Sequence, residues 1–314
     1  MVVHSNDAVD REKQGCVFAR GHCLVHVLGP APYQACVLST VFFEGGGSLT
    51  DRWELADSTR HGSFLVRPHK PLYFLLANWC DNPNKQPDSG NPETSLPVPV
   101  PLQAVECKFQ FSFKFKVWEG IFGKHGDLWL AYSQSSRWQV YNSDLSRLFR
   151  ETNYEPEVLL NFATDVKVLG FKLRMLGGGL NHQSNGRSYF LTRSWNRVLL
   201  QIGFERPHWT VVLRPWMRLP EEVSVDENPN VERYIGRGDL LVVRTLGHHE
   251  LSFLGRHSLD LDPGRGSLQL DWAIPVGQRF KVHAQIFHGY GESLIDFNYS
   301  QTTVGLGFSL IEWN

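Results

Sequence analysis

Hydrophobic and polar residues alternate one by one along much of the chain. Residues 108–117 read KFQFSFKFKV, with phenylalanine at four odd positions and lysine, glutamine or serine between them. A repeat of two residues is that of a β-strand, because successive side chains of a strand point to opposite faces, whereas an amphipathic helix repeats every ~3.6 residues. The same alternation returns at residues 197–205, 208–214, 281–286 and 303–310, and further strand-like runs lie near residues 72–78, 127–135, 156–165, 169–184, 234–246, 250–257 and 267–274.

These runs add up to roughly a dozen strands, many of them about ten residues long, joined by Gly, Pro, Asn and Asp. No amphipathic helix of ordinary length competes with them. The alternation fits a soluble β-sandwich as well as a membrane barrel. Strand length and an even strand number favour a closed antiparallel barrel, which exposes no strand edge. We therefore predict an all-β fold, an antiparallel transmembrane β-barrel.

The composition is compatible with a membrane barrel and excludes several other classes of protein. The chain has 314 residues, 42% of them hydrophobic and 20% charged, and its formal net charge of -1 gives no sign of a nucleic-acid partner. No uncharged apolar run approaches the ~18–20 residues of a transmembrane helix. The five cysteines are odd in number and form no CxxC pair, which argues against a zinc site and against a disulfide framework.

The N-terminal region does not have the pattern of an ordinary export signal. A signal peptide has a basic start, an apolar core and a small-residue cleavage site, whereas residues 1–15 (MVVHSNDAVDREKQG) are too charged for this. We interpret residues 1–47 as an N-terminal extension, a degenerate or mis-started export segment, and residues 48–314 as the barrel domain.

The segment 181–197, NHQSNGRSYFLTRSWNR, carries the candidate chemistry. His182 and Ser184 are two residues apart in a strand-like run, so their side chains share a face with Cα atoms about 6.5–7 Å apart, and the imidazole can act as base for the hydroxyl. Asn196 follows a turn, where an antiparallel neighbour can bring its amide to the other imidazole nitrogen. Asn196 and the apolar even-numbered residues 198–204 lie on the same face of the predicted strand, which is the lipid-facing side of a barrel.

The spacing alone is also compatible with a His–Ser pair that has no catalytic role. A His–Ser pair two residues apart is common by chance, and the GxSxG elbow of the α/β-hydrolases is absent. A hydrophilic group on a lipid-facing surface nevertheless suits an enzyme whose substrate is the lipid itself.

The same segment resembles the active-site signature of the bacterial outer-membrane phospholipase A family, through NHQSNGRS followed by TRSWNR. Three more motifs occur in the order that the family has: YSQSSRWQ (Tyr132–Gln139), FRETNYEPE (Phe149–Glu157) and GYGESLIDFN (Gly289–Asn298). A weaker similarity extends from about Trp53 to the C-terminus, and thus over most of the chain.

The resemblance implies a twelve-stranded barrel in the outer membrane of a Gram-negative bacterium. It also implies a phospholipase A1/A2 that hydrolyses acyl ester bonds of phospholipids and lysophospholipids. Ser184 would be the nucleophile, His182 the general base and acid, and Asn196 the residue that orients the imidazole. The Gly186 amide would help to hold the oxyanion. Family members become active as homodimers, with an acyl-chain groove between the two barrels.

The resemblance further implies a calcium (Ca2+) site close to the serine. The matching positions are Arg187, through its carbonyl, and Ser146 of the partner subunit. Thr192 and Glu227 stand where the family usually has Ser and Asp, so the hydroxyl gains a methyl group and the carboxylate is one methylene longer. We therefore expect an intact catalytic group with a higher calcium requirement than usual.

Gln134 shares a face with Leu128, Leu130 and Tyr132. A polar amide on a lipid-facing surface is costly unless it finds a partner. It is either a residue of the interfacial rim or a contact to a second barrel, and the family's dimer contact at this motif favours the second barrel.

The remaining features carry no chemistry in this interpretation. Five tryptophans are expected in the aromatic girdles of the barrel: Trp129, Trp195, Trp209, Trp216 and Trp313. GYGESLIDFN is expected to be an outer turn, without a catalytic role for Glu292 or Asp296, and His248, His249 and His257 to be loop and strand-end residues. The rival hypotheses are a catalytically silent barrel and a soluble β-protein that binds a ligand.

Overall fold

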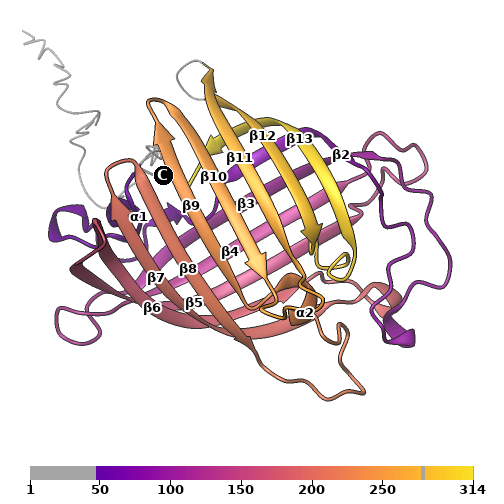
Figure 1. Cartoon of the computed structure of the whole chain (residues 1–314), viewed down its shortest axis with the longest axis horizontal. Coiled ribbons are helices and arrows are strands. Elements are labelled where there is room, and N and C mark those ends of the chain that lie inside the picture. Colours follow the sequence, from indigo (N-terminus) through magenta and orange to yellow (C-terminus); the bar gives the residue numbers. More distant parts are fainter. Residues whose placement is uncertain (1–46, 277–279, 314) are drawn as a thin grey trace, which may run out of the picture. The chain divides into compact units, whose positions relative to one another are not determined.

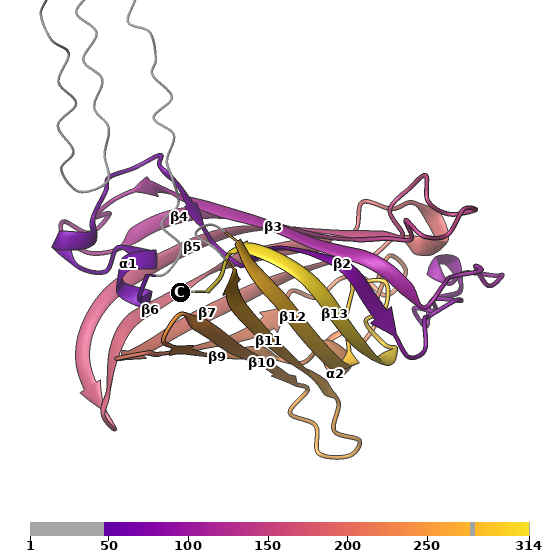
Figure 2. The same ribbon diagram turned by 90° about the horizontal axis from the view of Figure 1, so that it is seen from above.

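The computed structural model describes residues 47–276 and 280–313 of the chain. Within them, twelve antiparallel strands, β2 to β13, close into a barrel in which each strand pairs with its neighbour in sequence and β13 pairs with β2 (Figure 1, Figure 2). The strands are β2 (Leu72–Cys80), β3 (Val105–Trp118), β4 (Asp127–Trp138), β5 (Glu151–Val168), β6 (Phe171–Ser184), β7 (Ser194–Arg206), β8 (Trp209–Arg218), β9 (Gly238–Leu246), β10 (His249–His257), β11 (Gly266–Val276), β12 (Phe280–Tyr290) and β13 (Ser300–Ile311). The predicted all-β, twelve-stranded antiparallel barrel is confirmed.

The first barrel strand is interrupted, and all helical elements are short. β1 (Val66–Pro68) and β2 both pair with β3. The helical elements are α1 (Leu49–Trp53), η1 (Asp57–Thr59), η2 (Pro92–Thr94), η3 (Tyr189–Leu191) and α2 (Glu232–Ile235). Among residues 47–276 and 280–313, every helix is too short to span a lipid bilayer. Residues 1–46 lie outside the described residues, so the interpretation of the N-terminal extension stays a prediction.

The two ends of the barrel differ in their connections. At one end, here the short-turn end, strands are joined by the two-residue turns 169–170, 207–208 and 247–248. At the other, the long-loop end, the connections include residues 81–104, 139–150 and 219–237. Figure 1 shows α1 at the short-turn end and α2 at the long-loop end. Short turns at one end and long loops at the other are typical of membrane-spanning β-barrels.

The helix α1 is held at the short-turn end by its own cap and by β7. Ser48 and Asp51 form a capping box at the N-terminus of α1, which satisfies two of its free N–H groups. Thr50 donates its backbone N–H to Glu205 of β7 at 2.8 Å. Leu49 packs over Gly203, where a Cβ atom would come within 2.6 Å of the leucine side chain. Any larger residue at this point of β7 would force the Leu49 side chain to shift.

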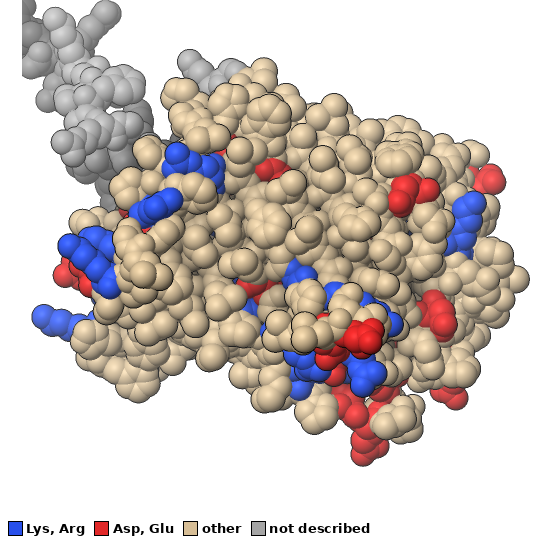
Figure 3. Space-filling model, in the orientation of Figure 1, with Lys and Arg blue, Asp and Glu red and all other residues tan. Residues whose placement is uncertain are grey.

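The barrel reverses the arrangement of a soluble protein, with polar side chains inside and apolar ones outside. On β3, Lys114 and Lys116 are 0% and 1% exposed, whereas Phe111 on the opposite face of the strand is 46% exposed. Lys114 Nζ lies 3.5 Å from the ring centre of Trp53, which offsets part of the cost of burying the ammonium group. The outer surface shows a wide area largely without charged side chains (Figure 3). Such a surface is suited to hydrocarbon.

The prediction that five tryptophans lie in the aromatic girdles is partly wrong. Trp129, Trp195 and Trp216 are buried in an apolar cluster inside the barrel. Their positions have the opposite parity to the lipid-facing residues of the same strands, as Trp129 has to Leu128 and Leu130. The tryptophans that are most exposed on the described strands are Trp79, Trp118 and Trp272.

The segment GYGESLIDFN is an end of β12 followed by a connection that folds inward. Leu294 and Phe297 are buried, and Glu292 forms ion pairs with Lys108 at 2.6 Å and with Arg137 at 2.8 Å. The motif therefore closes the long-loop end of the barrel from inside. Asp296 is likewise held in an ion pair, with Arg150 at 3.1 Å.

Replacing Glu292 with glutamine should destabilise the barrel by about 3–5 kcal/mol, because the two buried cations lose their partner. Burial opposes ionisation of Glu292, but Arg137 and Lys108 outweigh it and lower the pKa from 4.5 to about 2. The stability from this carboxylate is therefore present above about pH 4.5 and is lost as the pH falls through about 2. Urea midpoints, measured by the gel mobility of folded and unfolded protein, test this, with the exposed Glu93→Gln as control. A Glu292→Gln midpoint equal to that of the wild type would contradict it.

Candidate active site

His182 and Asn196 form a hydrogen-bonded pair on the outer surface of the barrel. They lie directly opposite each other on β6 and β7, and His182 Nδ1 is 2.9 Å from Asn196 Oδ1. Since the amide oxygen only accepts, Nδ1 carries the proton and Nε2 is left as the basic nitrogen. Leu180 and Leu200, which share the faces of these residues, are 55% and 56% exposed. The predicted lipid-facing position of Asn196 is thus confirmed.

Ser184 lies two residues beyond His182, on the same face of β6. Its cross-strand neighbours are Tyr154 of β5 and Ser194 of β7. In the described part of the chain, no hydrogen bond joins the Ser184 hydroxyl to the His182 ring. Such bonds are often long before substrate binds, so the catalytic assignment of Ser184, His182 and Asn196 stays a prediction.

Gly186 follows in the connection between β6 and β7, with a backbone that favours glycine. Its φ is +60°, in the left-handed region. A Cβ atom built on it would come within 3.0 Å of the Tyr154 ring. The tyrosine ring therefore packs directly over the glycine, next to the hydroxyl-bearing end of β6.

Asn185, which the sequence analysis did not single out, holds this connection in place. It is 3% exposed, and its Oδ1 accepts hydrogen bonds from the backbone N–H of Arg187 at 3.2 Å and of Arg193 at 3.0 Å. Its Nδ2 donates to the Leu191 carbonyl at 2.7 Å. An Asn before Gly commonly bonds the backbone of its own turn, and this was the available signal in the sequence.

A cluster of oxygen atoms lies beside the same connection. The Thr192 hydroxyl donates to Glu227 Oε1 at 2.7 Å, and the Ser194 hydroxyl donates to Glu227 Oε2 at 3.0 Å. The structure therefore brings together two of the four predicted calcium ligands, Thr192 and Glu227, and adds Ser194. Oxygen donors of this kind are those that calcium prefers.

The other two predicted ligands are not bonded to this cluster in the described residues. The Arg187 guanidinium donates to the Arg150 carbonyl at 2.7 Å, while no described hydrogen bond uses the carbonyl of Arg187. Ser146 lies in the connection between β4 and β5, and its carbonyl accepts from Trp138 Nε1 at 2.8 Å. The described residues contain no group of three His, Cys, Asp or Glu side chains that could hold a metal ion.

Gln134 lies on the lipid-facing side of β4, one strand away from Tyr154 and two from Ser184. Its Oε1 accepts from the Tyr132 hydroxyl at 2.9 Å, and its Nε2 donates to Ser136 at 3.4 Å. One amide N–H and one oxygen lone pair remain after these bonds. Gln134 thus has partners within its own barrel and capacity for one more, so its predicted contact with a second barrel stays a prediction.

Directly behind the His182–Asn196 pair, a second pair joins the same strands from inside the barrel. Gln183 and Trp195 are cross-strand neighbours, and Trp195 Nε1 donates to Gln183 Oε1 at 2.9 Å. Trp195 is 0% exposed. Because each of these residues is adjacent in sequence to a residue of the outer pair, this bond restrains the separation of His182 and Asn196.

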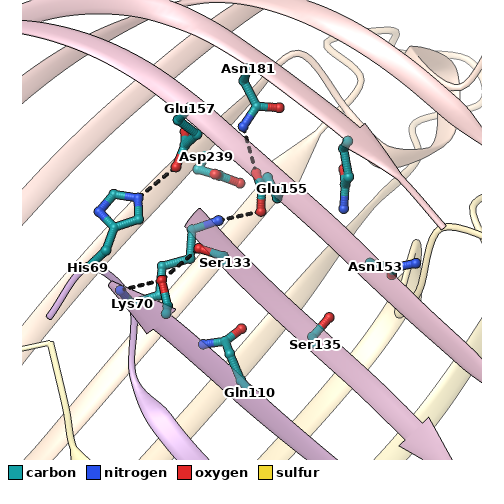
Figure 4. A network of polar contacts seen from close by, with 12 residues as sticks. His69, Lys70, Gln110, Ser133, Ser135, Asn153, Glu155, Glu157, Asn181 and Asp239 are labelled. Carbon is teal, nitrogen blue, oxygen red and sulfur yellow. Dashed lines mark hydrogen bonds and ion pairs between the residues drawn. The ribbon is translucent and has the colours of Figure 1, made fainter. Parts of the chain in front are cut away.

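A network of buried charges extends this support across β5. Arg197 Nε donates to Asn181 at 3.0 Å, and Arg197 pairs with Glu155 at 3.1 Å. Glu155 also binds Asn181 and Lys70, as Figure 4 shows. The guanidinium of Arg197 lies 4.0 Å from the ring centre of Trp195. Strands β5, β6 and β7 are therefore locked together beneath the candidate site.

A hollow of about 560 Å³ lies in the lipid-facing surface next to His182 and Asn196. Its walls are mostly apolar and include Phe113, Leu130 and Leu180. An apolar hollow that opens beside an imidazole has the chemistry to receive a hydrocarbon chain.

The model of the family described as Phospholipase A1 matches residues 49–310 of this chain. A phospholipase A1 of Salmonella typhimurium is 42% identical over 194 residues, which are 62% of this chain and 65%, just under two thirds, of that protein. A phospholipase A1 of Klebsiella pneumoniae is 39% identical over 247 residues, which are 79% of this chain and 82% of that protein.

Two solved structures have the same fold. The outer membrane phospholipase A from Escherichia coli superposes with a TM-score of 0.72 at 35% identity, over 80% of this chain and 100% of that chain. The Salmonella typhi outer membrane phospholipase, a dimer with bound calcium, also has a TM-score of 0.72, at 36% identity over 81% of this chain and 94% of that chain.

Replacing Trp195 with phenylalanine should lower the turnover of the ester hydrolysis expected from the sequence by about tenfold or more and leave KM nearly unchanged. The reason is that the bond to Gln183 is lost and the His182–Asn196 geometry loosens. Trp216→Phe is the matched control, since its indole donates to the Gly236 carbonyl and not to β6. Steady-state kinetics of both variants check this, and equal turnover in the two would reject the support role of Trp195.

Proposed function

Because the chain belongs to the phospholipase A1 family, we propose that it hydrolyses acyl ester bonds of phospholipids and lysophospholipids at the outer membrane of a Gram-negative bacterium. The observation that carries the proposal is the hydrogen-bonded His182–Asn196 pair on the lipid-facing surface, next to an apolar hollow. An enzyme for soluble esters would have its reactive group in water, whereas this one meets its substrate within the bilayer.

In the proposed mechanism, Ser184 is the nucleophile and His182 the base. The Nε2 atom of His182 takes the proton of the Ser184 hydroxyl as its oxygen attacks the ester carbonyl, and returns it to the leaving glycerol oxygen. Water then cleaves the acyl-serine with the same base. Asn196 accepts from Nδ1–H throughout, which keeps Nε2 toward the serine; a neutral amide stabilises the imidazolium less than a carboxylate would.

The backbone N–H of Gly186 is the proposed oxyanion donor. It follows the nucleophile by two residues in a turn that is fixed by Asn185 and covered by Tyr154. A donor that is held rigidly before the reaction needs no reorganisation as the charge develops.

The oxygen cluster of Thr192, Ser194 and Glu227 supports a calcium site. Hydroxyl and carboxylate oxygens are already within hydrogen-bonding distance of one another, and the carbonyl of Arg187 would complete the set together with Ser146 of the partner subunit. When bound, calcium would stabilise the negative charge that develops on the substrate. The longer carboxylate of Glu227 already spans two hydroxyls, which supports a higher calcium requirement.

The proposed active state is a homodimer. Three observations support it: the spare hydrogen-bonding capacity of Gln134 on the lipid-facing side, its place two strands from Ser184, and the dimeric state of the Salmonella typhi structure. A second barrel over this face would also cover the hollow beside His182, which would then hold an acyl chain between two protein surfaces.

Replacing Ser184 with alanine should lower fatty-acid release from phospholipid micelles by at least about a thousandfold, because the nucleophile is lost. Ser188→Ala is the control, since this exposed serine lies in the same connection. Both variants are compared with the wild type in the presence of calcium. Equal rates for the wild type and Ser184→Ala would contradict the proposal and favour a catalytically silent barrel.

The double substitution Thr192→Ser with Glu227→Asp should lower the calcium concentration for half-maximal fatty-acid release by about fivefold. The reason is that a shorter carboxylate bonds less well to the neighbouring hydroxyls, so more of its oxygens are available to calcium. A chelator should abolish release by both proteins. Glu221→Asp, in the same long connection, serves as control. A midpoint for the double variant that equals or exceeds that of the wild type would count against the expected calcium requirement.

A further inference from the structure

A row of alternating cations and aromatic rings crosses the outer surface at the short-turn end. Arg206 at the end of β7 lies opposite Trp209 of β8, and Trp209 lies opposite Arg244 of β9. Leu251 and Trp272 continue the row on β10 and β11. All share the parity of lipid-facing residues, and Trp272 is 45% exposed. We call Arg206, Trp209 and Arg244 the arginine–tryptophan row.

The two guanidinium groups of this row are stacked on rings and not on carboxylates. The Arg206 guanidinium lies 4.5 Å from the ring centre of Phe171 and 5.1 Å from that of Trp209. The Arg244 guanidinium lies 4.8 Å from the ring centre of Trp209. Across the described parts of the chain, neither group has an ion pair or a hydrogen bond. Inside the barrel, by contrast, Arg137 and Arg197 are each paired with a glutamate.

The acidic residues nearby already have other partners. Glu205, next to Arg206 in sequence, faces the inside of the barrel and accepts from Thr50. Asp165 pairs with Lys172 and Arg174. The charge of the arginine–tryptophan row is therefore not neutralised by the described residues.

The row lies one membrane thickness away from the candidate active site. Arg206 lies ten positions after Asn196 along β7. At about 3.3 Å per residue and a strand tilt of about 40°, they span a height of about 25 Å, which is the height of the apolar band of outer-membrane barrels. The lipid-facing residues between them are all apolar: Val198, Leu200, Ile202 and Phe204. The row therefore lies at the level of the lipid phosphates of the opposite leaflet.

We propose that Arg206, Trp209 and Arg244 form a binding site for the head group of an anionic phospholipid in the leaflet at the short-turn end. Guanidinium groups bind phosphate oxygens in pairs of parallel hydrogen bonds, and an indole at the interface contacts the glycerol and upper acyl region. Two cations favour a head group with a net negative charge over a zwitterionic one, whose ammonium they repel. The site rests on insertion of the barrel in a membrane and not on its catalytic residues.

The test uses native mass spectrometry of the full chain released from micelles that contain diether phosphatidylglycerol or diether phosphatidylcholine. These lipids have no acyl ester, so the candidate active site cannot consume them. The wild type should retain phosphatidylglycerol in preference to phosphatidylcholine. Arg206→Gln with Arg244→Gln should bind it about 30-fold more weakly, given the contribution of each basic residue at a membrane surface. Arg265→Gln, which removes an arginine stacked 4.4 Å from Tyr234, should behave as the wild type.

Several outcomes would overturn the proposal. They are equal retention of phosphatidylglycerol by the wild type and the double glutamine variant, equal retention of the two lipids by the wild type, and displacement of the lipid by millimolar inorganic phosphate, which would indicate a site for free anions. If the double glutamine variant fails to fold, Arg206→Lys with Arg244→Lys replaces it. This variant should retain less lipid than the wild type, because lysine cannot form the paired hydrogen bonds. Retention equal to that of the wild type would contradict the bidentate contact. A wild type without phospholipase activity would reject the proposed function and leave this result standing.

Discussion

A strand in a lipid bilayer cannot leave its backbone N–H and C=O groups unpaired, because no water is present to bond them. In this chain the constraint is met by closure, with β13 returning to pair with β2. Closure then assigns every second side chain to lipid and the others to the interior. The buried Lys114 and the exposed Phe111 of one strand follow from it.

The same alternation explains how the proposed catalytic pair His182 and Asn196 can lie on a lipid-facing surface and still be rigid. On the outer side, the side chains of His182 and Asn196 are hydrogen-bonded to each other. Their sequence neighbours Gln183 and Trp195 point inward, where the polar interior of the barrel can hold them. The geometry of the outer pair is thus restrained by contacts inside the barrel. A strand is well suited to this because neighbouring residues point to its two opposite faces.

The lipid-facing surface also has two polar levels separated by an apolar band. One level contains Ser184, His182 and Asn196, and the other contains Arg206 and Arg244. Their separation along β7 corresponds to the height of the hydrocarbon region. A barrel of this height meets the phosphates of both leaflets, and each level presents the side chains that suit lipid chemistry there.

The approximate positions of the strands, their parity and the motif around Ser184 could be predicted from the amino-acid sequence, because period-two alternation is local and reports which side chains share a face. The parity even contained the inward position of Trp129, since Leu128 and Leu130 mark the opposite face of that strand. Which residues from distant segments meet, such as Thr50 with Glu205 and Arg137 with Glu292, became visible only in the folded barrel. The reason is physical: loop paths are set by packing and buried charge pairing between strands far apart in the chain, and no local pattern encodes them.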